Sequence, residues 1–81
     1  MKNIKKGKIR METLTKVNSS MVYAVGYDYI NKELEVVFNT GKIWIYKDVS
    51  QNVYEKLINS SSIGSFMINN IIDFYKEERI N

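Results

Sequence analysis

Residues 33–38 alternate charged with apolar side chains, and a short Asn39-Thr40-Gly41 segment joins them to the largely apolar residues 42–46. Alternation with a period of two is typical of half-buried strands, and a glycine at this place is typical of a hairpin loop. A three-residue loop pairs Val36 with Trp44, whereas a two-residue loop shifts the register and moves the aromatic side chains to the other face. We favour the three-residue loop, because Gly41 adopts the required positive φ without steric cost.

This register divides the side chains of the hairpin between two faces. The face that we expect to form the core carries Leu34, Val36, Phe38, Trp44 and Tyr46. The opposite face carries Glu33, Glu35, Val37, Ile43 and Ile45. We expect its carboxylates to be solvated, like those of Asp28 and Asp48, because ionised side chains are seldom buried. The apolar middle of this face is too large for a fully solvated surface, and we expect it to be covered.

The rest of the chain predicts one more strand and two helices. Residues 22–29 are rich in β-branched and aromatic side chains, which predicts a strand, and residues 30–32 form the turn that follows. Ser50 is a good N-cap for a helix that reaches Ile58, and the serines at 60–62 can cap a second helix that continues to about Glu78. The fold class is therefore α+β, a three-stranded antiparallel β-meander followed by two α-helices packed on one sheet face.

Composition excludes much of enzyme chemistry. The chain has 81 residues, which is enough for one core, and it contains neither cysteine nor histidine. Thiolate nucleophiles, the usual zinc ligands and the commonest proton shuttle are thus missing, and the carboxylates, lysines, serines and tyrosines form no recognisable catalytic constellation. We expect no enzyme, no cofactor and no metal. No apolar run is long enough for a membrane span or a secretory signal, so we expect a cytoplasmic protein.

Positive charge is concentrated at the N-terminus. Residues 1–16 have a net charge of +5, and residues 17–81 have a net charge of −2. We interpret residues 1–16 as a basic flexible arm and residues 17–81 as the folded domain. Such an arm can contact phosphate backbones without reading sequence, although a solvated tail has the same composition. The candidate phosphate contacts are Lys2, Lys5, Lys6, Lys8 and Arg10.

Two further groups of side chains are candidates for ligand contacts. Tyr23 and Tyr27 on the first strand could stack on bases, although core packing is the alternative for such aromatic residues. Ser61, Ser62 and Gly64 precede a helix whose first amides are unpaired, an arrangement that can bind a phosphate. Ordinary helix capping explains the same serines.

The chain resembles the KTSC domain, a small family found at the C-terminus of some lysyl-tRNA synthetases and as free-standing bacterial and phage proteins. The resemblance covers about residues 17–79. It rests on a sequence pattern that comprises Val17-x-Ser19-Ser20, Val25-Gly26-Tyr27-Asp28, Leu34-x-Val36-x-Phe38-x-x-Gly41-x-x-Trp44-x-Tyr46-x-x-Val49 and Ser62-x-Gly64-x-Phe66. Trp44 stands where the family has a tyrosine, and Ile68 and Ile72 stand where an asparagine and a basic residue are usual. The synthetase context implies RNA binding.

Three functions remain as hypotheses. The first is a non-catalytic nucleic-acid-binding module that binds RNA, with the basic arm on the phosphates and strand aromatics on the bases. The second is a phage or bacterial interaction or inhibitor protein that acts as a homo-oligomer or on a protein partner. Its contact surface is the face of Val37, Ile43 and Ile45 or an open strand edge. The third is a protein that sequesters a small nucleotide at residues 60–64 or at a subunit interface.

Overall fold

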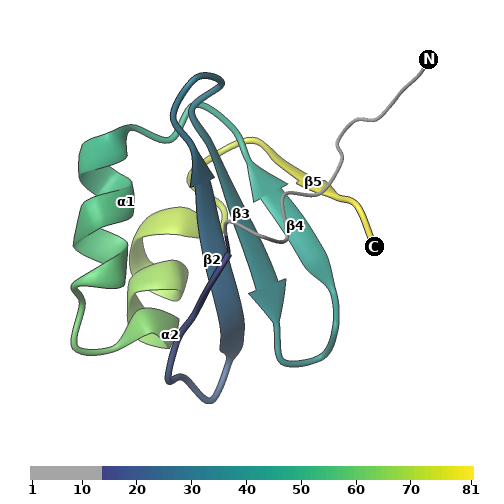
Figure 1. The fold of residues 1–81 in the computed structure, drawn as a ribbon, viewed down its shortest axis with the longest axis vertical. Coiled ribbons are helices and arrows are strands. Elements are labelled where there is room, and N and C mark those ends of the chain that lie inside the picture. Colours follow the sequence, from purple (N-terminus) through teal and green to yellow (C-terminus); the bar gives the residue numbers. More distant parts are fainter. Residues whose placement is uncertain (1–13) are drawn as a thin grey trace.

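In residues 14–81, which the computed structural model describes, the chain folds into one antiparallel sheet with helices on one side (Figure 1). The strands follow the chain in the order β1-β2-β3-β4-β5. They are β1 (Thr15–Lys16), β2 (Val22–Asp28), β3 (Glu33–Phe38), β4 (Ile43–Tyr46) and β5 (Glu77–Arg79). The central β2–β3–β4 meander is the one that the sequence predicts. Most of the basic arm lies outside the described residues.

The β3–β4 hairpin has the predicted register. Val36 pairs with Trp44 and Leu34 pairs with Tyr46. The Phe38 N–H donates to the carbonyl of Lys42 at 2.9 Å, so Asn39, Thr40 and Gly41 form the loop. Gly41 has a φ of 94°, a conformation that side chains with a Cβ rarely adopt. The prediction of a three-residue loop is therefore confirmed.

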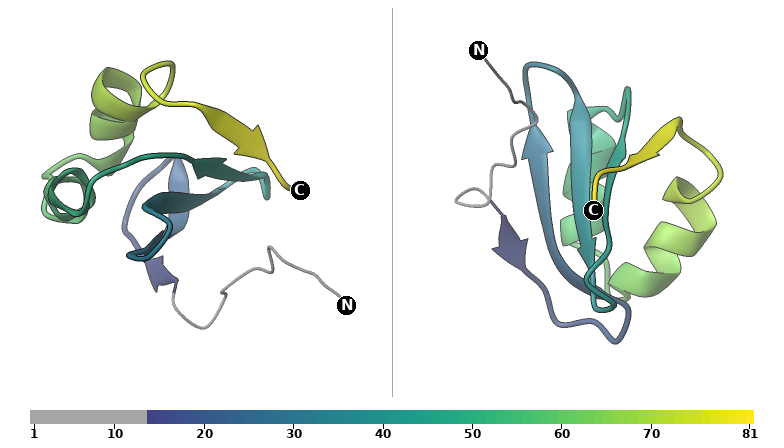
Figure 2. Two further views of the ribbon diagram at one scale, coloured as in Figure 1. Left: turned by 90° about the horizontal axis from the view of Figure 1, so that it is seen from above. Right: turned by 90° about the vertical axis from the view of Figure 1, so that its right-hand side faces the viewer.

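Both helical segments lie on the same face of the sheet (Figure 2), which we call the inner face. Helix α1 (Gln51–Ile58) begins at Ser50, whose hydroxyl accepts from the Val53 N–H at 3.3 Å. Helix α2 (Ile63–Phe66) begins at Ser62, whose hydroxyl accepts from the Ser65 N–H at 3.3 Å, and it continues as the π-helical segment η3 (Met67–Ile71). Serine therefore caps both helices, as its N-cap preference predicts.

The expectation of three strands and of a helix that reaches Glu78 is wrong, because the described chain has five strands and its last helical segment ends at Ile71. Ile72 is extended, and Asp73 has a φ of 72° that ends the helical path. The following residues form β5 on the free edge of β4, where the Ile80 N–H donates to the carbonyl of Ile43 at 2.9 Å. Tertiary strand pairing thus overrides the helical spacing of the apolar residues.

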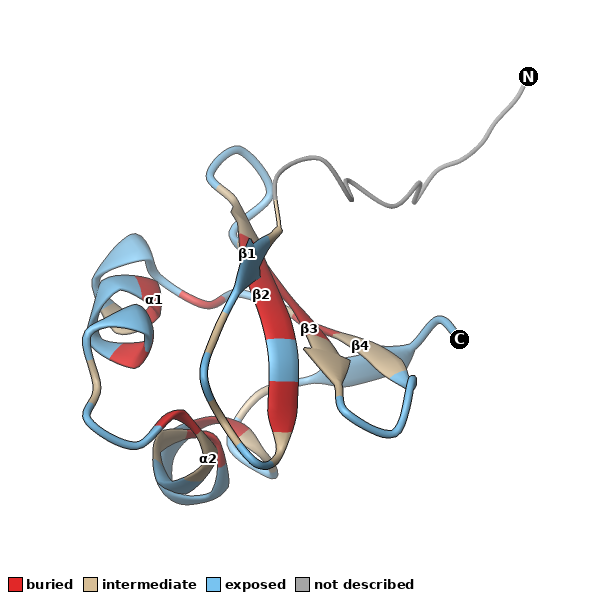
Figure 3. Cartoon of the chain, turned by 60° about the horizontal axis from the view of Figure 1, so that its bottom comes forward, coloured by how far each residue is buried: buried red, intermediate tan, exposed pale blue. Residues whose placement is uncertain are grey.

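The core lies between the inner face and the helices. Its largest fully buried side chains are Tyr46, Leu34, Leu57, Met67, Ile71, Val22, Val25, Val36 and Val49. Figure 3 shows this burial along β2 and β3 and on the facing sides of the helices. On the other face, the expectation of a solvated Glu35 is wrong, since this side chain is only 2% exposed. Glu35 lies on the central strand between Gly26 and Ile45, which are also buried.

A β-bulge in β2 changes the expected alternation. Val22 pairs with Phe38 and Ala24 pairs with Val37, so Tyr23 is the additional residue. Val22 and Val25 are both fully buried, and Tyr23 is 47% exposed. The simple period of two placed Tyr23 on the same face as Val25, and the bulge separates them.

Candidate functional site

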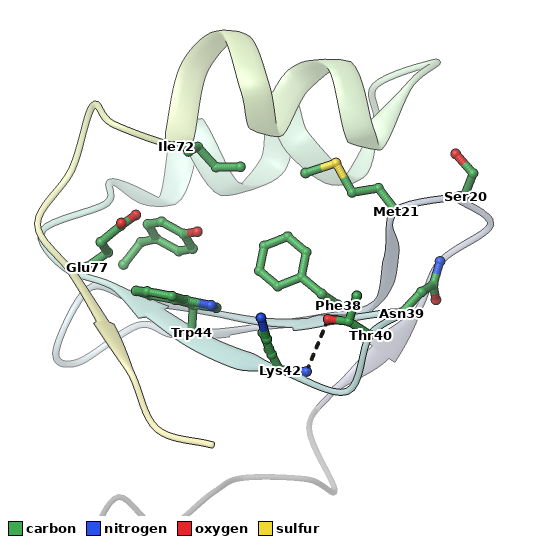
Figure 4. A pocket seen from close by; sticks show the side chains of 10 residues that line it. Ser20, Met21, Phe38, Asn39, Thr40, Lys42, Trp44, Ile72 and Glu77 are labelled. Atoms are coloured by element: carbon green, nitrogen blue, oxygen red, sulfur yellow. Dashed lines mark hydrogen bonds between the residues drawn. The ribbon is translucent and has the colours of Figure 1, made fainter.

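An apolar pocket opens between the two layers at the hairpin end of the sheet (Figure 4). Phe38 ends β3 and Trp44 lies on β4, and strand alternation directs both side chains to the inner face. The helices leave both rings half-buried. The pocket has a volume of about 510 Å³ and is lined by Ser20, Met21, Phe38, Asn39, Thr40, Lys42, Trp44, Tyr46, Ile72 and Glu77. This volume is in the range of small-molecule sites.

Polar side chains surround this aromatic floor. Lys42 lies on one side of Trp44 and Glu77 on the other (Figure 4). Both side chains are exposed, so their charges face solvent at the mouth of the pocket. The loop wall is fixed by Asn39, whose side-chain amide donates to the carbonyl of Ser19 at 3.0 Å. The pocket thus combines flat apolar surfaces with one cation and one carboxylate.

Strand β5 holds Glu77 in place. Glu77 pairs with Tyr46 across the β4–β5 ladder, and the Lys47 N–H donates to the carbonyl of Lys76 at 2.9 Å. On the opposite face, the Lys47 ammonium lies 3.2 Å from a carboxylate oxygen of Glu78. The wall that carries Glu77 is therefore part of the sheet and not a loose terminus.

Tyr46 forms the deep end of the pocket and is 2% exposed. Burial, followed by the nearby Glu77 and Asp73 carboxylates, raises the pKa of its hydroxyl to about 12. The shift disfavours the phenolate, so this hydroxyl keeps its proton to a higher pH than an exposed tyrosine does.

The tyrosines predicted to bind bases have different surroundings. Tyr27 stacks on Tyr54 with ring centroids 4.9 Å apart and an interplanar angle of 11°, and its hydroxyl donates to the carbonyl of Val49. Its ring is therefore part of an intramolecular stack. Tyr23 is exposed, and the Lys16 ammonium lies 5.1 Å from its ring centroid. The candidate phosphate contacts Lys2, Lys5, Lys6, Lys8 and Arg10 lie outside the described residues.

The predicted phosphate site at Ser61, Ser62 and Gly64 lines a second hollow of about 360 Å³. This hollow is more polar and shares Ser20 and Met21 with the aromatic pocket. The Ser62 hydroxyl is already the cap of α2, and the helix is only four residues long. Capping accounts for the hydrogen bond of Ser62, and phosphate binding by these residues stays a prediction.

The pocket was not predicted from the sequence, because strand alternation assigned Phe38 and Trp44 to the closed core. Their strand parity is correct, but parity does not tell how completely the helices cover each ring. No feature of the sequence placed Glu77 in a site, since the helical spacing of residues 63–75 suggested that the helix continued through it. Within residues 14–81, no three Asp, Glu, His or Cys side chains are grouped closely enough to bind a metal ion, and no helix could cross a membrane.

Comparison with known proteins decides the family. A sequence model of the KTSC domain matches residues 18–75, which is more than half of the chain. The chain belongs to the KTSC domain family. The KTSC match begins after β1 and ends before Glu77, so the β5 wall of the pocket lies beyond the matched range.

Solved structures support the same assignment. The crystal structure of a KTSC domain protein from Yersinia pestis superimposes with a TM-score of 0.82 at 25% sequence identity. The alignment covers 84% of this chain and 96% of the Yersinia protein. No curated protein matches the sequence. The KTSC fold is therefore established for this chain, with two helices against an antiparallel sheet.

Proposed function

We propose that this KTSC domain is a non-catalytic nucleic-acid-binding module that binds single-stranded RNA. The aromatic pocket carries this proposal. Phe38 and Trp44 offer ring surface at the mouth of a pocket of about 510 Å³. Unpaired RNA bases are commonly recognised by stacking on aromatic side chains, which contributes about 1–3 kcal/mol per base. The Tyr27 ring is left out of the proposed surface because it stacks on Tyr54.

Positive charges beside the pocket suit the phosphate backbone. Lys42 lines the rim, and Arg79 pairs with Trp44 in the β4–β5 ladder and so belongs to the same face. The basic arm, with its net charge of +5 over residues 1–16, adds further phosphate contacts in this proposal. The folded domain would position a base, and the arm would supply affinity that depends on salt.

The sole tryptophan of the chain makes a direct test available, because Trp44 lines the pocket. We expect a single-stranded RNA heptamer to change Trp44 fluorescence saturably, and we expect an RNA duplex of the same length to bind more weakly. Lys42→Gln should lower the affinity several-fold and reduce the salt slope by about 0.7, the value for one phosphate contact on a single strand.

Lys56→Gln is the matched control, since Lys56 is exposed in the last turn of α1 and does not line the pocket. Equal loss of affinity in the two variants would show that general charge, and not the pocket rim, determines binding. Unchanged Trp44 fluorescence, together with unchanged anisotropy of labelled RNA, would rule out the proposed function.

Native mass spectrometry of the untagged protein purified from cells separates the remaining hypotheses. Bound RNA supports the nucleic-acid proposal, and a discrete nucleotide mass supports nucleotide sequestration. A ligand-free homo-oligomer supports an interaction protein. The face proposed for such an interaction offers little free surface in the described chain, since Ile45 is only 8% exposed and Val37 and Ile43 are partly buried.

A further inference from the structure

The aromatic pocket has charges of opposite sign on the two sides of its floor. On the inner face of β4, Trp44 lies between Lys42, two residues before it, and Tyr46, two residues after it. Tyr46 is the ladder partner of Glu77. At about 3.3 Å per residue, Lys42 and the Tyr46–Glu77 pair are about 13 Å apart along the strand. A ligand that stacks on Trp44 therefore meets a carboxylate at one end and an ammonium group at the other.

Glu77 differs from the neighbouring acids of the sheet. Glu33 and Glu78 both lie near the Lys47 ammonium, at 3.6 Å and 3.2 Å. Within residues 14–81, no hydrogen bond or ion pair engages the Glu77 carboxylate. Because its backbone is paired with β4 on the inner face, Glu77 offers a carboxylate acceptor at the wall of the pocket.

We propose that the Trp44 pocket binds one unpaired guanine of a single-stranded RNA, with the base stacked on Trp44 and its Watson–Crick edge against the Glu77 carboxylate. The backbone phosphate of the same nucleotide then lies toward Lys42. This inference rests on the proposed RNA-binding function and adds the identity of the base. In this proposal Glu77 selects the base and Lys42 contacts the phosphate.

The chemistry of the base edges selects guanine. An ionised carboxylate offers only acceptors, two oxygens side by side. Guanine presents two adjacent donors on its Watson–Crick edge, the N1–H and the exocyclic amine, which match these oxygens in a bidentate contact. Adenine and cytosine place a ring-nitrogen acceptor beside the amine, and uracil flanks its single donor with carbonyls. Each of these three bases brings an acceptor toward the carboxylate.

The experiment uses the full chain and four RNA heptamers of uridine in which the central base is guanine, adenine, cytosine or uracil. Binding is followed by Trp44 fluorescence and by anisotropy of the labelled RNA. We expect the guanine heptamer to bind at least about fivefold more tightly than the others, the lower end of what a bidentate base contact contributes. Glu77→Gln should remove this preference, because the amide places a donor against guanine.

Glu78→Gln is the matched control, because Glu78 is the next residue and lies beside Lys47 on the opposite face. It should keep the guanine preference. A heptamer with central inosine, which lacks the exocyclic amine, should bind between guanine and uracil. Equal affinity for all four heptamers, or a preference that persists in Glu77→Gln, would overturn the guanine assignment and leave RNA binding intact. Absence of binding to every heptamer would instead overturn the proposed function itself.

Discussion

Tyr46 joins the core to the pocket, and its ionisation should be visible in the stability of the protein. Burial, with the Glu77 and Asp73 carboxylates, raises its pKa to about 12 from the ordinary 10.0. Below about pH 10 the hydroxyl is neutral in both states and does not affect the pH dependence. Between about pH 10 and 12 only the unfolded chain loses the proton, so the free energy of unfolding should fall by roughly 1.4 kcal/mol per pH unit.

Urea unfolding at pH 8, 10 and 11 measures this effect. Other groups also titrate in this window, because burial raises the pKa of Tyr27 and Tyr54 and the hydrogen bond to Glu78 raises that of Lys47. The Tyr46→Phe variant is therefore the reference, and it should lose less stability than the wild type above pH 10. Parallel pH curves for the two proteins would contradict the contribution of Tyr46.

For two other residues, Glu35 and Tyr23, strand alternation predicted the wrong burial. Glu35 occupies a strand position that alternation assigns to the outer face, and its charge suggested solvent. It is nevertheless only 2% exposed, on the central strand between Gly26 and Ile45. Tyr23 is exposed because one additional residue enters β2 beside Val22. Neither the lateral position of a strand nor a bulge can be recognised from the alternation of one strand.

At the scale of elements, the β3–β4 hairpin depends on Gly41. An added Cβ would meet nothing within 4 Å, so Gly41→Ala tests the backbone conformation alone. We expect this variant to lose about 1–2 kcal/mol of unfolding free energy, because an L-residue at a φ of 94° is strained. Equilibrium chemical denaturation measures the loss.

Gly64→Ala serves as the comparison for this prediction. Its φ is ordinary, and an added Cβ would lie 3.5 Å from the Cβ of Met21, at normal contact distance. We expect a change within about 0.5 kcal/mol, because the substitution fills space without strain. A Gly41→Ala variant as stable as Gly64→Ala would show that the loop can change its conformation at little cost.

The second helix shows the limit of periodicity. The apolar residues from Ile63 to Tyr75 keep helical spacing, and the sequence therefore predicted one long helix. The structure ends that path after Ile71 and leaves Phe74 65% exposed. Residues 77–79 gain backbone pairing with β4 instead, which local spacing cannot reveal because the partner strand is about 30 residues away in the chain.

At the scale of the whole molecule, the arm and the domain can be tested separately. The described chain enters the sheet at Thr15, so deletion of residues 1–13 removes five of the basic side chains and leaves β1 intact. If all five contact phosphates, the slope of log K against log salt for the RNA heptamer should become less steep by about 3.5. Salt titrations of both chains by anisotropy measure it, with circular dichroism to check folding.

The same titration has a clear negative outcome. An unchanged slope in the shortened chain would show that the arm makes no phosphate contacts. The change in Trp44 fluorescence at saturation should be the same in both chains, because the pocket belongs to the folded domain. Comparing the saturated Trp44 fluorescence of the two chains therefore distinguishes a loss of electrostatic affinity from damage to the pocket.

The sequence by itself determined the central meander, the loop at Gly41 and the serine caps of both helices, because these features depend on side-chain alternation and on local backbone chemistry. Only the tertiary structure decided the ends of the sheet, the burial of Glu35 and the aromatic pocket. The pocket lies between the layers, where the helices leave Trp44 and Phe38 partly uncovered. How far the helices cover these two rings, and the pairing of Glu77 with Tyr46, depend on contacts between segments distant in the chain.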